Sequence, residues 1–160
     1  MEKIAFQLSL LFYFCIPFRL TAQTVPEAPV YGNTEAGVDQ LLLIAKDQLL
    51  LDSTLYFTEL AIAKATDLNY QKGLLQAYYF MGTQYDDHSH LDKAMDAFQQ
   101  AEILAARQKD TLMSIKVAAA QGYAQHQMGK STEGQQSYLH ALDLANQIED
   151  QSYKVDIYNG

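Results

Sequence analysis

The feature that most constrains this chain is an internal repeat. From residue 35 onward the 160-residue sequence matches itself, without a gap, when it is shifted by 40 residues. Two alanine columns carry the register: Ala61, Ala101 and Ala141, and then Ala65, Ala105 and Ala145. Because residues four apart lie on one face of a helix, the columns predict that every unit buries the same face of small side chains. A period of this length indicates stacked helical units, none of which can bury its apolar face alone.

Apolar residues within each unit recur at spacings of three and four, which is typical of helices that bury one side. In the central unit Leu74, Tyr78 and Tyr85 mark such a stripe, and a polar stretch at 86–90 interrupts it. The pattern predicts helices at about 35–50, 53–68, 72–87, 91–108, 111–128 and 131–148. No hairpin signal joins two alternating β-branched runs. We therefore expect an all-α fold, an α-solenoid of antiparallel helix pairs with about three repeats and the start of a fourth.

The first 22 residues have the pattern of a secretory signal peptide. A short charged start precedes an apolar run from Ile4 to Phe18, and cleavage is expected near Ala22. The run is short for a membrane span, so we expect none in the mature chain, which would be exported to a periplasmic or extracellular location. The alternatives are a membrane anchor formed by residues 4–20 and a buried N-terminal helix. Residues 23–34 contain prolines and turn residues and are expected to form a linker.

Charge and cysteine content exclude some classes of function. The chain has 11 basic and 19 acidic residues, so it lacks the excess of cations that a nucleic-acid-binding surface needs. Its single cysteine excludes an intramolecular disulfide framework and a cysteine zinc site. The hydrophobic fraction of 49% is ample for a buried core.

The repeated unit resembles the tetratricopeptide repeat, most clearly in its central copy. Tyr78 stands at the position of the usual large aromatic residue, Met81 and Gly82 stand for the Leu-Gly pair, and Tyr85 for the next aromatic. The residues that carry the resemblance, and that it implies pack the repeats, are Tyr78, Gly82, Tyr85, Ala94, Phe98, Ala101, Gly122, Tyr138 and Ala141. We expect one repeat domain over 35–160, with units at about 35–74, 75–114 and 115–154 and an incomplete fourth unit to residue 160.

The chain departs from the family pattern in two ways. Its period of 40 exceeds the common repeat length of about 34 residues. The final proline of the pattern is replaced by Thr66, Ala106 and Asn146. Longer versions of this kind resemble the exported repeats of bacterial sensor and regulator proteins.

The resemblance implies a binding groove lined by the first helix of each pair. The candidate groove residues are Asp39, Leu43, Asp47, Gln76, Tyr79, Thr83, Asp86, Asp87, Lys116, Tyr123 and His126, with Lys46, Ala119 and Gln127 beside them. Tyrosines and carboxylates in such a groove would suit an extended or helical peptide with some basic character. The alternative is that these residues form only a solvated face. The Lys and Asn set with which one variant of the family grips a C-terminal carboxylate is not found at the corresponding positions.

Three functions from different classes remain open. The first is a non-enzymatic scaffold or adaptor without a cofactor that binds a protein or peptide partner. The second is the periplasmic sensing part of a longer two-component sensor kinase or transcription regulator. The third is a metal-dependent enzyme that uses Asp86, Asp87, His88 and His90, because a His-x-His motif with carboxylates can ligate zinc. No nucleophile elbow, phosphate loop or dinucleotide fingerprint supports other enzyme classes.

Residues 151–160 begin a fourth unit in the same register, and the chain stops within its first helix. An uncapped solenoid end would expose the apolar side of the helix at 131–148. The sequence therefore predicts either self-association through the C-terminal end or a chain that is part of a longer protein.

Overall fold

The structure is a computed structural model that describes residues 32–148. Helices make up 83% of them, and this described part contains no strand. The helices are α1 (Glu35–Lys46), α2 (Leu51–Asp67), α3 (Gln71–Asp87), α4 (Leu91–Gln108), α5 (Thr111–Gln127) and α6 (Ser131–Asn146). The predicted all-α class is confirmed.

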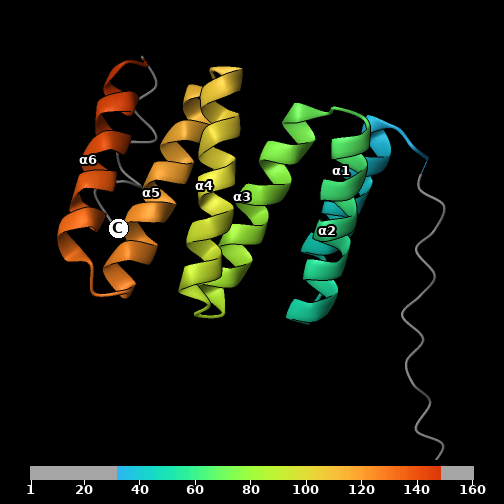
Figure 1. Ribbon diagram of the computed structural model, residues 1–160, viewed down its shortest axis with the longest axis horizontal. Helices are drawn as coiled ribbons and strands as arrows, with labels where there is room; N and C mark the ends of the chain where they lie inside the picture. The colour runs from blue at the N-terminus through green and yellow to red at the C-terminus, as the bar shows by residue number, and fades with distance from the viewer. Residues whose placement is uncertain (1–31, 149–160) are drawn as a thin grey trace, which may run out of the picture. The chain divides into compact units, whose positions relative to one another are not determined.

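Consecutive helices pack side by side through the described part of the chain (Figure 1). Contacts are most extensive within three pairs, α1 with α2, α3 with α4, and α5 with α6. Short connections make the members of each pair antiparallel. The first helices also touch one another, since α1 contacts α3 and α3 contacts α5. Three antiparallel pairs are thus stacked in chain order, as the sequence predicts, and we call the solvent-facing side of α1, α3 and α5 the first-helix face.

The backbone repeats with half the period of the sequence. Helices α2 to α6 begin at residues 51, 71, 91, 111 and 131, which are 20 residues apart. The residue two before each of the last four starts has a positive φ; these residues are Asn69, Ser89, Lys109 and Gly129. The amide that follows each of them donates to the carbonyl five residues earlier, as His90 does to Tyr85 at 2.8 Å. This pattern is the Schellman motif, which closes one helix and directs the chain into the next.

The connection between α1 and α2 is different, and here the helix bounds differ most from the expected ones. Helix α1 ends at Lys46 instead of residue 50, and α2 begins at Leu51 instead of residue 53. The leucines at 49–51 extend the apolar spacing of α1, but the side chain of Leu49 is 99% exposed. Its φ is not positive, so the left-handed turn of the other connections does not form.

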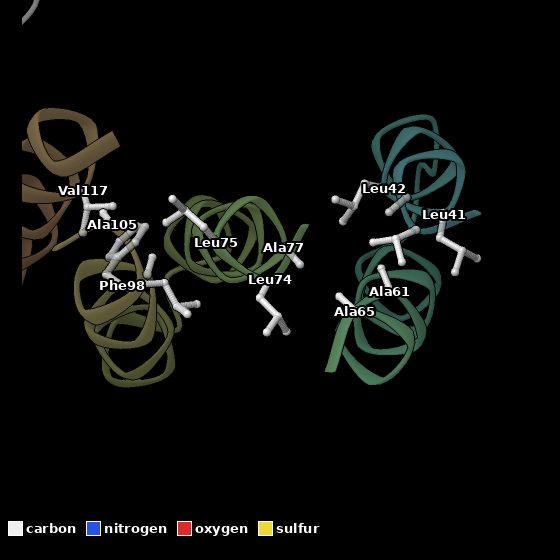
Figure 2. Packing of buried hydrophobic residues seen from close by; sticks show 14 of the residues in the cluster. Leu41, Leu42, Ala61, Ala65, Leu74, Leu75, Ala77, Phe98, Ala105 and Val117 are labelled. Carbon is white, nitrogen blue, oxygen red and sulfur yellow. The ribbon is translucent and has the colours of Figure 1, made fainter. Parts of the chain in front are cut away.

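The alanine columns lie at the centre of the packing. All six alanines, Ala61, Ala101, Ala141, Ala65, Ala105 and Ala145, are 0% exposed. Figure 2 shows Leu41 and Leu42 near Ala61 and Ala65 in the first pair, and Phe98 near Ala105 and Val117 further along the stack. These residues belong to one apolar cluster that runs from α1 to α5, while a second cluster joins α5 to α6. Burial of the small columns lets the two helices of each pair approach closely.

Glycines on α3 and α5 meet large side chains of the paired helix. A Cβ atom at Gly82 would lie 2.5 Å from the ring of Phe98, and one at Gly122 would lie 3.1 Å from the ring of Tyr138. Tyr78 and Tyr85 are half-buried against the first apolar cluster, and Ala94 is 0% exposed. The central and third pairs therefore use the same joint, a glycine on the first helix and an aromatic ring on the second.

Several expectations concern residues outside the described range. They are the signal peptide at 1–22 with its alternative anchor at 4–20, most of the linker at 23–34, and the fourth unit with its self-association. Within residues 32–148 no helix has the length and apolar character that crossing a membrane requires. Thr34, at the end of the expected linker, caps α1 by accepting a hydrogen bond from the amide of Gly37 at 3.1 Å.

Candidate peptide-binding face

The candidate groove residues lie on three helices that are neighbours in space. Asp39 and Leu43 belong to α1, and Asp47 follows its last turn. Helix α3 carries Gln76, Tyr79, Thr83, Asp86 and Asp87, and α5 carries Lys116, Tyr123 and His126. Because α3 contacts both α1 and α5, residues from three successive pairs are combined on the first-helix face.

A pocket of about 270 Å³ opens between α1 and α3. Its lining residues are Asp39, Leu42, Leu43, Lys46, Tyr70, Lys72 and Gln76. Three of the candidate groove residues thus meet here, and Leu43 contributes an apolar side chain that is 61% exposed. The pocket combines an apolar wall with two ammonium groups, one amide and one carboxylate.

The carboxylate of this pocket already has a hydrogen-bond partner. The hydroxyl of Tyr70, just before α3, donates to Oδ1 of Asp39 at 3.3 Å. Burial, and then the charge of Asp39, raise the pKa of Tyr70 above its ordinary value, so the phenol stays a donor. This bond ties the first helix pair to the second and partly satisfies Asp39.

Sequence reasoning did not find Tyr70 and Lys72 as residues of this face. Tyr70 precedes α3 and Lys72 lies in its first turn, where the chain enters the second pair. Their place beside α1 depends on how far the second pair is displaced along the first, so no sequence signal could have found them.

A second polar group lies where α3 meets α5. The side-chain amide of Gln127 donates to Oδ1 of Asp86 at 2.9 Å. Burial and the neighbouring charge of Asp87 raise the pKa of Asp86, while the bond from Gln127 lowers it. The last turn of α3 contains no basic residue, so both carboxylates stand at the negative end of the helix dipole without local compensation.

Tyr138 of α6 contributes a buried hydroxyl to the same region. Its oxygen has no hydrogen-bond partner. Burial raises the pKa of Tyr138, and smaller contributions come from Tyr123 and Asp86. The sequence assigned Tyr138 to packing alone, and its ring does pack over Gly122. Only the folded chain shows that its polar end approaches the first-helix face.

Two of the candidate groove residues are partly buried and contact groups inside the helix stack. The ring of Tyr79 lies 6.2 Å from that of Phe98, and burial raises the pKa of Tyr79. The hydroxyl of Thr83 donates to the carbonyl of Phe80 at 2.8 Å. By contrast, Asp87, Lys116 and His126 are exposed, and Tyr123 is 48% exposed. A partner would therefore meet mainly the exposed side chains near α5 and those of the α1–α3 pocket.

The side chains of the histidine turn have local roles. Nδ1 of His88 lies 2.8 Å from the carbonyl oxygen of Gln84, and the ring of His90 stands edge-on to Tyr85 at 6.2 Å. Among the described residues no group of three or more His, Cys, Asp or Glu side chains is arranged to hold a metal ion.

The chain matches no protein-family model and has no significant match among curated proteins. The resemblance to tetratricopeptide repeats therefore stays a prediction, and the function has to be argued from the face itself.

Proposed function

We propose that this protein is a non-enzymatic scaffold that binds a segment of a protein partner along its first-helix face. The single observation that carries this proposal is the pocket between α1 and α3, which gathers side chains of two successive helix pairs around the exposed Leu43. Binding sites are typically concave surfaces that combine apolar walls with a few convergent polar groups. A long side chain of a bound segment would insert between the two helices.

The rest of the first-helix face supports an elongated ligand. Beyond the pocket, α3 continues toward the exposed Tyr123 and His126 of α5. Tyrosine is favoured at protein interfaces because it offers a large contact area with a polar tip. An extended segment could follow α3 from the pocket to these residues, which is how stacked helix pairs present a continuous surface.

Binding is tested with a display library of random ten-residue peptides selected on the full chain. We expect enriched peptides to lose affinity when Leu43→Asp or Tyr123→Asp places a charge on the first-helix face. The matched controls are Ile103→Asp on α4 and Leu139→Asp on α6, which alter apolar side chains that are 40% and 54% exposed on second helices. Equal loss in the controls, or no peptide enriched over an unrelated protein, would overturn the proposal.

The cellular setting is proposed from the sequence alone. With a signal peptide at residues 1–22, the scaffold would act outside the cytoplasm, and the intact mass of the native protein tests this. A mass reduced by residues 1–22 is the expected result, whereas retention of that segment would indicate the anchored alternative. The sensor interpretation depends on parts outside residues 32–148 and stays a prediction.

A further inference from the structure

The two lysines of the α1–α3 pocket are available to a ligand. Lys46 and Lys72 line the pocket from opposite helices, and neither forms an ion pair with the described residues. The Lys46 ammonium lies 6.0 Å from the centre of the Phe80 ring. Asp39, the one carboxylate of the pocket, is bonded to Tyr70. The residues that line the pocket therefore carry one more positive than negative charge beside an apolar wall, and the carboxylate of Glu35 also acts on Tyr70.

The opposite end of α3 carries the opposite charge. Asp87 is exposed and shares a stripe of α3 with Gln76 and Thr83, because their spacings of seven and four residues keep side chains on one helix face. Asp86 stands beside it, held by Gln127. The first-helix face thus changes from basic to acidic along α3, although the chain as a whole is acidic.

The distance between the two charged regions follows from helix geometry. Asp87 is eleven residues beyond Gln76 and fifteen beyond Lys72, which corresponds to about 16–23 Å at a rise of about 1.5 Å per residue. An extended segment advances about 3.3 Å per residue, so about five to seven residues span the same distance.

From these charges, and building on the proposed function, we infer the chemistry of the partner. The partner segment is extended and carries an acidic side chain, flanked by an apolar one, that enters the α1–α3 pocket between Lys46 and Lys72. It also carries a basic side chain, about five to seven residues away, that reaches Asp87. Such a segment complements the face at both ends, whereas a uniformly charged segment is repelled at one of them.

The peptide library tests this inference through charge reversal. We expect the unaltered chain to enrich peptides that contain an acid and a base about five to seven residues apart. Lys46→Glu with Lys72→Glu should replace the selected acid by a base, and Asp87→Lys should replace the selected base by an acid. A matched control, Arg107→Glu with Lys130→Glu, changes the net charge equally but alters exposed residues at the ends of second helices. It should leave the selected pattern unchanged.

Affinity measurements then quantify the effect on one enriched peptide. In fluorescence anisotropy, the double lysine reversal should weaken binding about tenfold, because each exposed ion pair contributes a few-fold and reversal adds repulsion. Circular dichroism of each variant checks that the helices remain.

The outcomes separate the two proposals. Peptides that bind, and that Leu43→Asp disrupts, but that show no paired charges or ignore the reversals, would overturn the inferred chemistry and leave the scaffold function standing. Absence of any enriched peptide would overturn both.

Discussion

The first and second helix pairs place large and small side chains on opposite helices at equivalent positions of the repeat. Where the second pair places Gly82 on α3 against Phe98 on α4, the first pair has Leu42 and Thr58, each 40 residues earlier. Leu42 is 4% exposed and Thr58 is 0% exposed, so both are as well buried as their counterparts. The joint can therefore be filled from either helix, provided that one partner is large and the other small.

Other positions of the same two pairs are also reversed. The last turn of α1 contains Lys46, which suits the helix dipole, whereas α3 has Asp86 at the equivalent place. The connection of the first pair holds the exposed Leu49, and that of the second holds Ser89 with a φ of 61°. The repeat thus specifies where helices meet and turn, while the residues at each position decide stability and surface charge.

The largest expected effect comes from truncating Phe98, the large side chain that α4 packs against Gly82 of α3. Phe98→Ala should lower the free energy of unfolding by about 3–5 kcal/mol, because the ring is fully buried and would leave a cavity. Urea unfolding followed by circular dichroism measures the change. Thr58→Ala, at the same position of the first pair, should cost about 1 kcal/mol through loss of its hydrogen bond to Thr54. Equal losses of unfolding free energy from the two substitutions would contradict the conclusion that the large side chain lies on the second helix in one pair and on the first helix in the other.

The next effect tests whether the first joint can be transplanted. Gly82→Leu should destabilise the protein by about 1–3 kcal/mol, since even a Cβ would meet the Phe98 ring. Adding Phe98→Thr creates the pairing of the first joint, and a double-mutant cycle should show a favourable coupling of at least about 1 kcal/mol. Gly122→Leu with Phe98→Thr serves as the control, and its two costs should add.

A smaller effect is expected at the connections. Gly129→Ala should destabilise the protein by about 1 kcal/mol, because φ is 76° there. Since no neighbouring atom lies within 4 Å of the new methyl group, the cost comes from the backbone conformation alone. Ser89→Gly should stabilise the protein by a few tenths of a kcal/mol for the same conformational reason. Leu49→Gly should not stabilise it, since Leu49 has no positive φ. Thermal unfolding distinguishes these outcomes, and a gain from Leu49→Gly would show that the first connection shares the left-handed turn.

The smallest effect concerns the charges at the helix ends. Because burial raises the folded-state pKa of Asp86, its ionised form opposes folding, and this penalty fades as pH falls through that pKa. Asp86→Asn should therefore stabilise the protein by a few tenths of a kcal/mol at pH 7 and have no effect below the ordinary carboxyl range. Asp92→Asn, in the first turn of α4, should instead be slightly destabilising at pH 7. A gain from Asp86→Asn that does not change with pH would contradict this explanation.

Much of the first-helix face was predictable from the sequence, because periodicity assigns residues to helix faces. Asp39, Leu43 and Gln76 were expected together, and the structure places all three around one pocket. Tyr70 and Lys72 were not expected there, since their position beside α1 depends on how far the second pair is displaced along the first. The hydroxyl of Tyr138 was missed for a similar reason, because its ring had to pack over Gly122 before the oxygen could approach Asp86.

The sequence by itself determined the helices, their order and the small-residue columns, because helical spacing and burial of alanine are local requirements that the 40-residue register repeats. The tertiary structure alone decided where α1 ends, which lysines share a pocket and which carboxylates remain exposed. Those outcomes depend on how neighbouring pairs slide against each other, and close contacts between pairs, such as that of Gly73 on α3 with Val38 on α1, limit that displacement.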